Sequence, residues 1–240
     1  MFKKILKFFG LPSSVAPFPS LPQGMNEIGD YKVLLEQSAL FTRTLGFDTP
    51  EINWKNCDVL GADGDFIRKI GEAANIIDFS SSAGQCLKWC HYIRPYAEKI
   101  LEVPVWLTIG QLWKSNKTVF NPSWEDFQKW STLGISLPEL RDQNRSGINL
   151  HAWLTVATGE IIEPTLMSSI AAVNPQIADS FRGAITWGRE PGFIKDHRYF
   201  PMVVGDTIAE AMHQKSSLPL LARCQTDLSE IPIFIELSTR

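Results

Sequence analysis

The sequence predicts an α+β domain, because two amphipathic helical segments precede a region with strand patterning. Residues 31–47, YKVLLEQSALFTRTLGF, carry apolar residues at helical spacing and reach a stop signal at a glycine. Residues 64–79, GDFIRKIGEAANIIDF, have a second helical pattern. Residues 103–109 are rich in β-branched and aromatic side chains, and residues 149–165 alternate on both sides of a glycine turn. The last two segments predict a strand and a β-hairpin.

The remaining segments divide the chain into an N-terminal arm and one domain. Residues 1–24 form a basic segment followed by a Pro- and Ser-rich arm, and residues 25–240 are expected to form a single domain. Residues 113–147 form a Trp-rich insertion that includes a short helix opened by Ser123. Helix and strand signals follow at 205–215 and 231–237.

The N-terminal segment MFKKILKFFGLP is too short and too interrupted for a signal peptide or a membrane span. It predicts either a frayed terminal helix or a basic surface that contacts a membrane. We therefore expect a cytoplasmic protein, with membrane contact limited to this segment. The net charge of −3 lacks the basic excess of nucleic-acid-binding proteins, so no nucleic-acid partner is expected.

The stretch SSSAGQCLKWCH, residues 80–91, combines a helix-start signal with two cysteines. Ser82 and Gln85 have the spacing of a capping box, which predicts that Cys86 lies in the first helical turn. There the positive end of the helix dipole favours a thiolate. Cys90 lies one turn further on and is expected in the core. No second ligand pair with zinc spacing accompanies these cysteines, and their three-residue separation differs from that of a redox pair, so no metal is expected.

The predicted hairpin brings a histidine and a carboxylate onto one face. His151 and Trp153 share a face of the first strand. The apolar residues that alternate with them along this strand are expected to face the core. A three-residue loop, 157–159, with Gly159 in the left-handed conformation places Glu163 opposite Trp153 and diagonal to His151. A two-residue turn would instead place Glu163 on the core face.

A thiol at a helix start, an imidazole on a strand and a carboxylate on the next strand are the components of nucleophilic acyl transfer. The imidazole accepts or holds the thiol proton, and the carboxylate orients the imidazole. The residues that satisfy this description are Cys86, His151 and Glu163.

Three segments of the sequence resemble the transglutaminase-like branch of the papain-like cysteine enzymes: GQC, ILEVPVWLTIGQL and HAWLTVATGEIIEPT. The resemblance covers about residues 60–166. It implies a papain-like core, in which a helix bearing the cysteine packs on an antiparallel sheet bearing the histidine and the acid. It also implies that Cys86 is the nucleophile, His151 the base and Glu163 the acid, where the family usually has aspartate. Pro95 predicts that the cysteine-bearing helix is short or kinked.

The oxyanion and substrate contacts have several candidates. The backbone N–H of Cys86 would supply one donor from the helix start. The side-chain candidates for oxyanion or substrate contacts are Gln85, Trp153, Trp54 and Asn75. The tryptophans of the insertion, Trp113, Trp124 and Trp130, are expected either to line a substrate groove or to pack a loop onto the core.

The sequence-based hypothesis is a cysteine-dependent enzyme that cleaves an amide in a protein or peptide substrate through a thioester and needs no cofactor. Peptidase, amidase and glutamine deamidase activities all fit this chemistry. One alternative is a transglutaminase that uses an amine as acceptor. Another is a non-catalytic protein-interaction module on the same fold.

Overall fold

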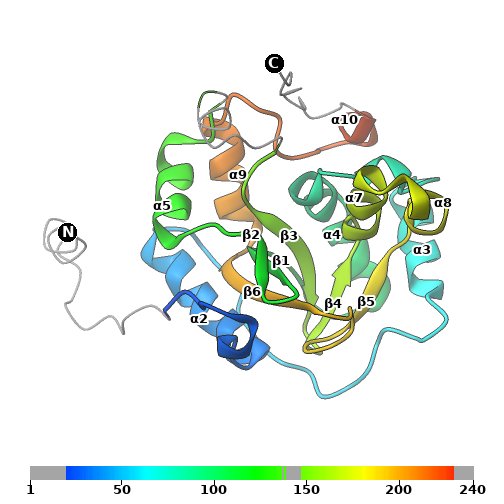
Figure 1. Cartoon of the computed structure of the whole chain (residues 1–240), viewed down its shortest axis with the longest axis horizontal. Helices are drawn as coiled ribbons and strands as arrows, with labels where there is room; N and C mark the ends of the chain where they lie inside the picture. The colour runs from blue at the N-terminus through cyan, green and yellow to red at the C-terminus, as the bar shows by residue number, and fades with distance from the viewer. Residues whose placement is uncertain (1–19, 137, 139–146, 230–240) are drawn as a thin grey trace, which may run out of the picture.

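The computed structural model describes residues 20–136, 138 and 147–229. It is an α+β structure with a six-stranded antiparallel sheet and helices on both sides (Figure 1). The basic segment predicted within residues 1–19 and the strand predicted at 231–237 lie outside the described residues. Among the residues described, no helix combines the length and the apolar character needed to cross a membrane.

The secondary-structure elements keep the labels of Figure 1. The helices are α2 (Tyr31–Thr44), α3 (Asp65–Ala73), α4 (Cys86–Leu101), α5 (Trp124–Leu133), α7 (Leu166–Val173), α8 (Ala178–Phe181), α9 (Asp206–Lys215) and α10 (Gln225–Ser229). Three 3₁₀ turns are η1 (Met25–Glu27), η2 (Ser80–Ser82) and η3 (Pro175–Ile177). The strands are β1 (Val105–Lys114), β2 (Lys117–Phe120), β3 (His151–Val156), β4 (Glu160–Glu163), β5 (Thr186–Arg189) and β6 (His197–Val204).

Local sequence signals explain where several helices begin. The Asp30 side chain accepts a hydrogen bond from the Val33 N–H at 3.1 Å and caps α2. Ser123 opens α5, as expected from the sequence, and forms a reciprocal capping box with Asp126. The helix predicted within 64–79 is shorter in the structure, where α3 ends at Ala73.

The strand predicted at 103–109 is longer than expected, because β1 is the centre of the sheet. Strand β6 pairs with one edge of β1 along Thr108–Lys114. The other edge pairs with β3 along Val105–Gly110 and then with β2 along Leu112–Lys114. Strands β2 and β3 therefore lie end to end on the same edge of β1, and β4 and β5 continue the sheet beyond β3.

Both faces of β3 are buried, which differs from the single core face expected from the sequence. The even-numbered residues belong to the main core, which also contains Cys90 and Ala97 of α4. On the opposite face Trp153 packs with Tyr31 of α2 and Leu166 of α7. In the view of Figure 1 the sheet lies in the middle of the molecule, with α5 and α9 to its left and α3, α4, α7 and α8 to its right.

The Trp-rich segment expected as an insertion at 113–147 is partly built into the sheet and core. Trp113 is a residue of β1, and Trp124 and Trp130 lie on α5. All three side chains are buried in the main core. Of the two expectations for these tryptophans, packing onto the core is the one found.

Candidate active site

Helix α4 begins at Cys86, so the thiol occupies the first turn as expected. The predicted capping box is wrong, because Gln85 is itself the N-cap residue and no side chain caps this helix. The Gln85 amide donates to the Ser81 carbonyl at 2.9 Å, and the Ser82 hydroxyl donates to the Pro164 carbonyl at 3.3 Å. Ser82 therefore ties the turn before Cys86 to the loop after β4 instead of capping the helix.

Helix α4 continues through Pro95 to Leu101, so the expectation of a short helix is wrong. A proline inside a helix lacks the N–H that would bond to the carbonyl four residues earlier. This cost is offset by packing, because Trp89, Ile93 and Ala97 on both sides of the proline are buried in the main core.

The β3–β4 hairpin has the geometry predicted from its turn. Residues 157–159 connect the strands, and Gly159 has φ +88°. Leu154 pairs with Ile162, and this register places Glu163 opposite Trp153. His151 Nε2 and Glu163 Oε2 are 2.6 Å apart, and the two residues are only 2% and 0% exposed. A single left-handed glycine thus fixes the register that brings the imidazole and the carboxylate together.

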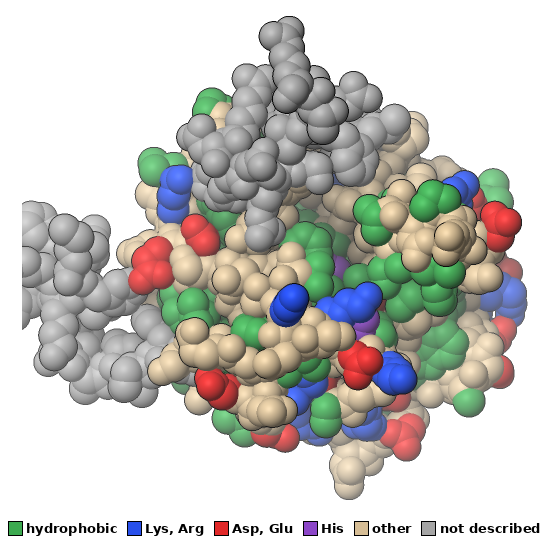
Figure 2. Space-filling model, in the orientation of Figure 1, with side chains coloured by type: hydrophobic (Ala, Val, Ile, Leu, Met, Phe, Trp, Pro, Cys, Tyr) green, Lys and Arg blue, Asp and Glu red, His purple; other side chains and the backbone are tan. Residues whose placement is uncertain are grey.

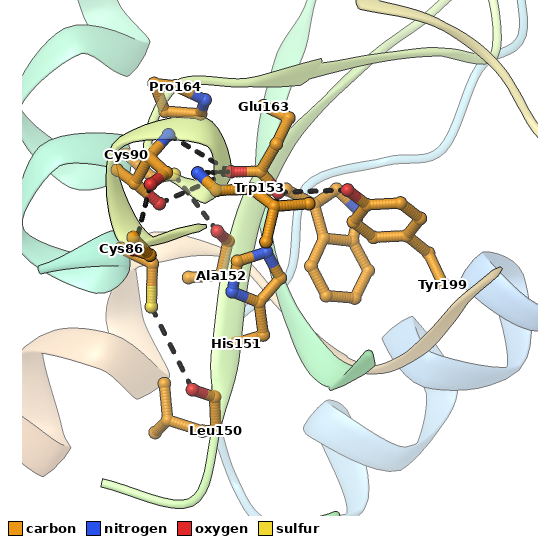
Figure 3. Close-up of polar contacts among 12 residues, drawn as sticks. Cys86, Cys90, Leu150, His151, Ala152, Trp153, Glu163, Pro164 and Tyr199 are labelled. Carbon is orange, nitrogen blue, oxygen red and sulfur yellow. Dashed lines mark hydrogen bonds and ion pairs between the residues drawn. The ribbon is translucent and has the colours of Figure 1, made fainter. Parts of the chain in front are cut away.

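The Cys86 thiol lies against the start of β3. Its Sγ is 3.9 Å from the Leu150 carbonyl oxygen, and the side chain is partly exposed. Figure 3 shows the His151 ring between the Cys86 sulfur and the Glu163 carboxylate. Because Nε2 is bonded to Glu163, Nδ1 is the ring nitrogen left to face the thiol. Figure 2 shows a hollow on this face of the molecule in which hydrophobic and histidine side chains are visible.

The Glu163 carboxylate accepts five hydrogen bonds although it is fully buried. Oε1 accepts from the N–H and hydroxyl of Thr165 and from the N–H of Leu166, at 3.1 to 3.3 Å. Oε2 accepts from His151 at 2.6 Å and from the Tyr199 hydroxyl at 3.2 Å. Leu166 begins α7, so the carboxylate also lies at the positive end of a helix. These donors stabilise a buried negative charge, which would otherwise be costly.

The electrostatics of this pair favour a protonated imidazole. Burial of His151 disfavours its charged form, but the charge of Glu163 and the contacts with Cys86 and Glu163 outweigh burial and raise the pKa of His151 to about 10. His151 is then an imidazolium at neutral pH, held between a carboxylate and a thiol. Such a cation stabilises a thiolate beside it.

Aromatic side chains hold the imidazole ring on both sides. Phe120 stacks on the ring of His151 with centroids 5.3 Å apart, and Trp153 stacks at 5.8 Å. Phe120 reaches His151 because β2 and β3 follow one another along the same edge of β1. The ring orientation is therefore set by packing as well as by its bond to Glu163.

Two sequence-predicted contact residues, Gln85 and Trp153, lie close to Cys86 and His151 in the chain. Trp153 is fully buried, and its indole N–H donates to the Tyr31 hydroxyl at 2.7 Å. Its ring supports His151 and is not exposed at the surface. Gln85 precedes the nucleophile position, and its amide N–H is bonded to Ser81.

The other two candidates lie elsewhere. Trp54 packs on Trp106 with centroids 5.4 Å apart, and its indole donates to Glu36. Its neighbour Lys55 bonds to Ala157 at the turn of the hairpin, which is the opposite end of β3 from His151. The Asn75 amide donates to Gln225 of α10 at 2.9 Å. Both residues precede the cysteine in the sequence, and chain order alone does not specify their position in space.

Sequence patterns did not indicate three of the groups that complete the site. These are Tyr199 of β6, Phe120 of β2 and the first N–H groups of α7. The first two reach the site through strand order in the sheet. The third had a local signal that the prediction did not use, since EPTL places a carboxylate immediately before a helix start.

Comparison of the chain with protein-family models, with curated proteins and with solved structures found no match in any of the three.

Proposed function

We propose that this protein is a cysteine-dependent acyl-transfer enzyme that cleaves an amide through a thioester, with a Cys86–His151–Glu163 triad. The observation that supports the proposal most strongly is the placement of a partly exposed thiol beside a buried imidazole, whose other nitrogen is 2.6 Å from a buried carboxylate. The papain-like resemblance of the sequence agrees with this geometry. The first turn of a 16-residue helix adds positive potential at the sulfur.

In the first half of the proposed reaction, the Cys86 thiolate attacks the carbonyl carbon of the amide and forms a C–S bond. The Cys86 N–H is the first of α4 and has no acceptor within the helix, so it is placed to stabilise the oxyanion. The C–N bond then breaks, and the His151 imidazolium gives its proton to the leaving nitrogen. The products of this half are an amine and a thioester on Cys86.

In the second half, water attacks the thioester and His151 accepts a proton from it. The C–S bond breaks, a carboxylic acid is released, and the thiolate and imidazolium are restored. Throughout both halves Glu163 orients the ring. An amine in place of water would give the transglutaminase outcome.

Alkylation of the purified protein with iodoacetamide at pH 6–7, followed by mass spectrometric mapping, tests the nucleophile. Cys57 and Cys224 are exposed and serve as internal references. We expect Cys86 to react at least about tenfold faster than either, because only Cys86 has an imidazolium beside it. Equal rates at the three cysteines would exclude Cys86 as an activated nucleophile.

Acyl transfer itself is tested with p-nitrophenyl acetate as the acyl donor. We expect a burst of nitrophenol, an acetyl group on Cys86 and slow turnover to acetate, all lost in Cys86→Ala. The same reaction with monodansylcadaverine separates hydrolysis from amine transfer. A stable dansyl amide formed faster than acetate would replace hydrolysis with the transglutaminase reaction. Alkylation without acyl transfer would indicate the non-catalytic module.

A further inference from the structure

Glu163 has a second hydrogen-bond donor on the oxygen that faces His151. Tyr199 lies on β6, and its hydroxyl donates to Glu163 Oε2 at 3.2 Å, where His151 Nε2 is bonded at 2.6 Å. Figure 3 shows the Tyr199 hydroxyl pointing to the carboxylate from the side opposite Cys86. The two donors fill the two lone pairs of this oxygen.

Tyr199 is fixed in this position and stays protonated. The residue is fully buried, and its ring packs on Trp153 and Phe193 with centroids 5.0 and 5.4 Å apart. Burial, followed by the charge of Glu163, raises the pKa of Tyr199 well above its usual value. The phenol is therefore a donor to Glu163 at neutral pH.

The position of the proton between Glu163 and His151 depends on how well the carboxylate is satisfied. Each donor to a carboxylate lowers its affinity for a proton, so a proton shared with a neighbouring imidazole remains on the imidazole. Without the Tyr199 hydroxyl, Oε2 would have an unfilled lone pair at a position closed to solvent. Glu163 would then compete more strongly for the His151 proton.

We propose that Tyr199 is a positioning residue of the Cys86 site: its hydroxyl holds the Glu163 carboxylate against His151, keeps the proton on His151, and so maintains the cation that stabilises the Cys86 thiolate. This inference rests on the proposed function, because it assigns Tyr199 a role only through the triad. Tyr199 itself has no contact with the thiol in the described structure and acts through Glu163.

Other titratable groups face Glu163, His151 and Tyr199, and these groups must stay unchanged when the variants are compared with the wild type. Each of them interacts electrostatically with Glu163, His151 or Tyr199: Cys86 and Cys90 of α4, Tyr31 of α2, Glu190 before β6, and His197 at the start of β6. None of them is altered by replacement of Tyr199 with phenylalanine.

The experiment measures the alkylation rate of Cys86 against pH in the wild type, Tyr199→Phe and Tyr92→Phe. Its midpoint is the pH at which the rate is half its plateau. In Tyr199→Phe we expect the midpoint to rise by about one pH unit, since one hydrogen bond to a charged group is lost. Tyr92→Phe is the matched control, because it also removes a buried phenol but its hydroxyl donates to the Ala74 carbonyl. We expect its midpoint to remain at the wild-type value.

A double-variant cycle separates action through Glu163 from a general structural effect. Tyr199→Phe should shift the midpoint in the wild type but leave it unchanged in a Glu163→Gln background, where no carboxylate competes for the proton. An equal shift in both backgrounds, or no shift in either, overturns the inference while leaving the Cys86 nucleophile intact. Loss of selective Cys86 labelling in the wild type overturns the proposed function instead.

Should Tyr199→Phe fail to fold, 3-fluorotyrosine at position 199 provides the second measurement. Fluorine makes the phenol a stronger donor and leaves the ring packing nearly unchanged. We expect the midpoint to fall below that of the wild type, opposite to the phenylalanine variant. An unchanged or raised midpoint overturns the proposal.

Discussion

The first and second turns of α4 each carry a cysteine against a backbone carbonyl of β3, and the two thiols have opposite environments. Cys86 Sγ is 3.9 Å from the Leu150 carbonyl, and Cys90 Sγ is 3.4 Å from the Ala152 carbonyl. Cys86 is partly exposed and lies beside His151. Cys90 is fully buried, and burial together with the Glu163 charge raises the pKa of its thiol well above the usual value.

One helical turn therefore separates a partly exposed thiol beside an imidazole from a fully buried one. The potential of a helix terminus declines within its first turn, so Cys90 receives little of it. Cys90 also faces the main core, where a thiolate would lose its hydration. The reactivity expected of Cys86 therefore depends on its neighbours and its exposure, and the residue type alone does not account for it.

The largest expected effect comes from removing the imidazole. His151→Ala should slow the alkylation of Cys86 at pH 6–7 by about 100-fold, because the thiolate loses its cation. The rates at Cys57 and Cys224 should stay the same, and they provide the reference. His91→Ala is the matched control, since His91 lies on α4 and contacts the Ala222 carbonyl. If Cys86 were alkylated as fast in His151→Ala as in the wild type, the imidazole would not account for the difference expected between the two turns of α4.

Removal of the carboxylate charge should change the pH dependence of stability. The folded pKa of His151 is about 10, above its ordinary value of 6.5, so the folded protein holds an extra proton between these values. The resulting stabilisation is complete below pH 6.5 and is lost as the pH rises through about 10. We expect the wild-type Tm to fall between pH 7 and 10 and the Glu163→Gln curve to be flatter.

The control for this measurement is Glu160→Gln, which makes the same change on the same strand. Glu160 is buried, but it accepts a hydrogen bond from Thr158 and lies at the opposite end of β4. Its Tm should decline with pH as the wild-type Tm does. Parallel curves for Glu163→Gln and the wild type would show that the His151–Glu163 pair makes no pH-dependent contribution.

A smaller effect is expected at the second turn of α4. Cys90→Ala removes a buried sulfur and its contact with Ala152, so we expect it to lower the free energy of unfolding by about 1 kcal/mol. Urea denaturation measures this change. The alkylation rate of Cys86 should be that of the wild type. A slower rate would mean that the two thiols act together and would weaken the contrast between the turns.

The smallest effect is expected far from both turns. Trp54→Phe removes the bond to Glu36 but keeps an aromatic ring on Trp106, so the free energy of unfolding should change by about 0.5 kcal/mol or less. Cys86 alkylation and turnover of p-nitrophenyl acetate should be unaffected. Loss of turnover without loss of stability would place Trp54 in the site after all.

The sequence by itself determined the positions of Cys86, His151 and Glu163 because each depends on local rules. The alternation of side chains along a strand and the three-residue loop ending at Gly159 set the register between β3 and β4. A helix that starts after Gly84 and Gln85 places Cys86 in its first turn, although the cap predicted there does not form. These features span few residues, so the pattern of the chain is sufficient to predict them.

The tertiary structure alone decided which other side chains complete the site. Tyr199 reaches Glu163 because β6 pairs with β1, and Phe120 reaches His151 because β2 shares an edge of β1 with β3. The same packing places Trp54 near the turn of the hairpin, at the end of β3 away from His151. Strand order and the stacking of helices on a sheet arise from contacts between distant segments, and no local periodicity specifies them.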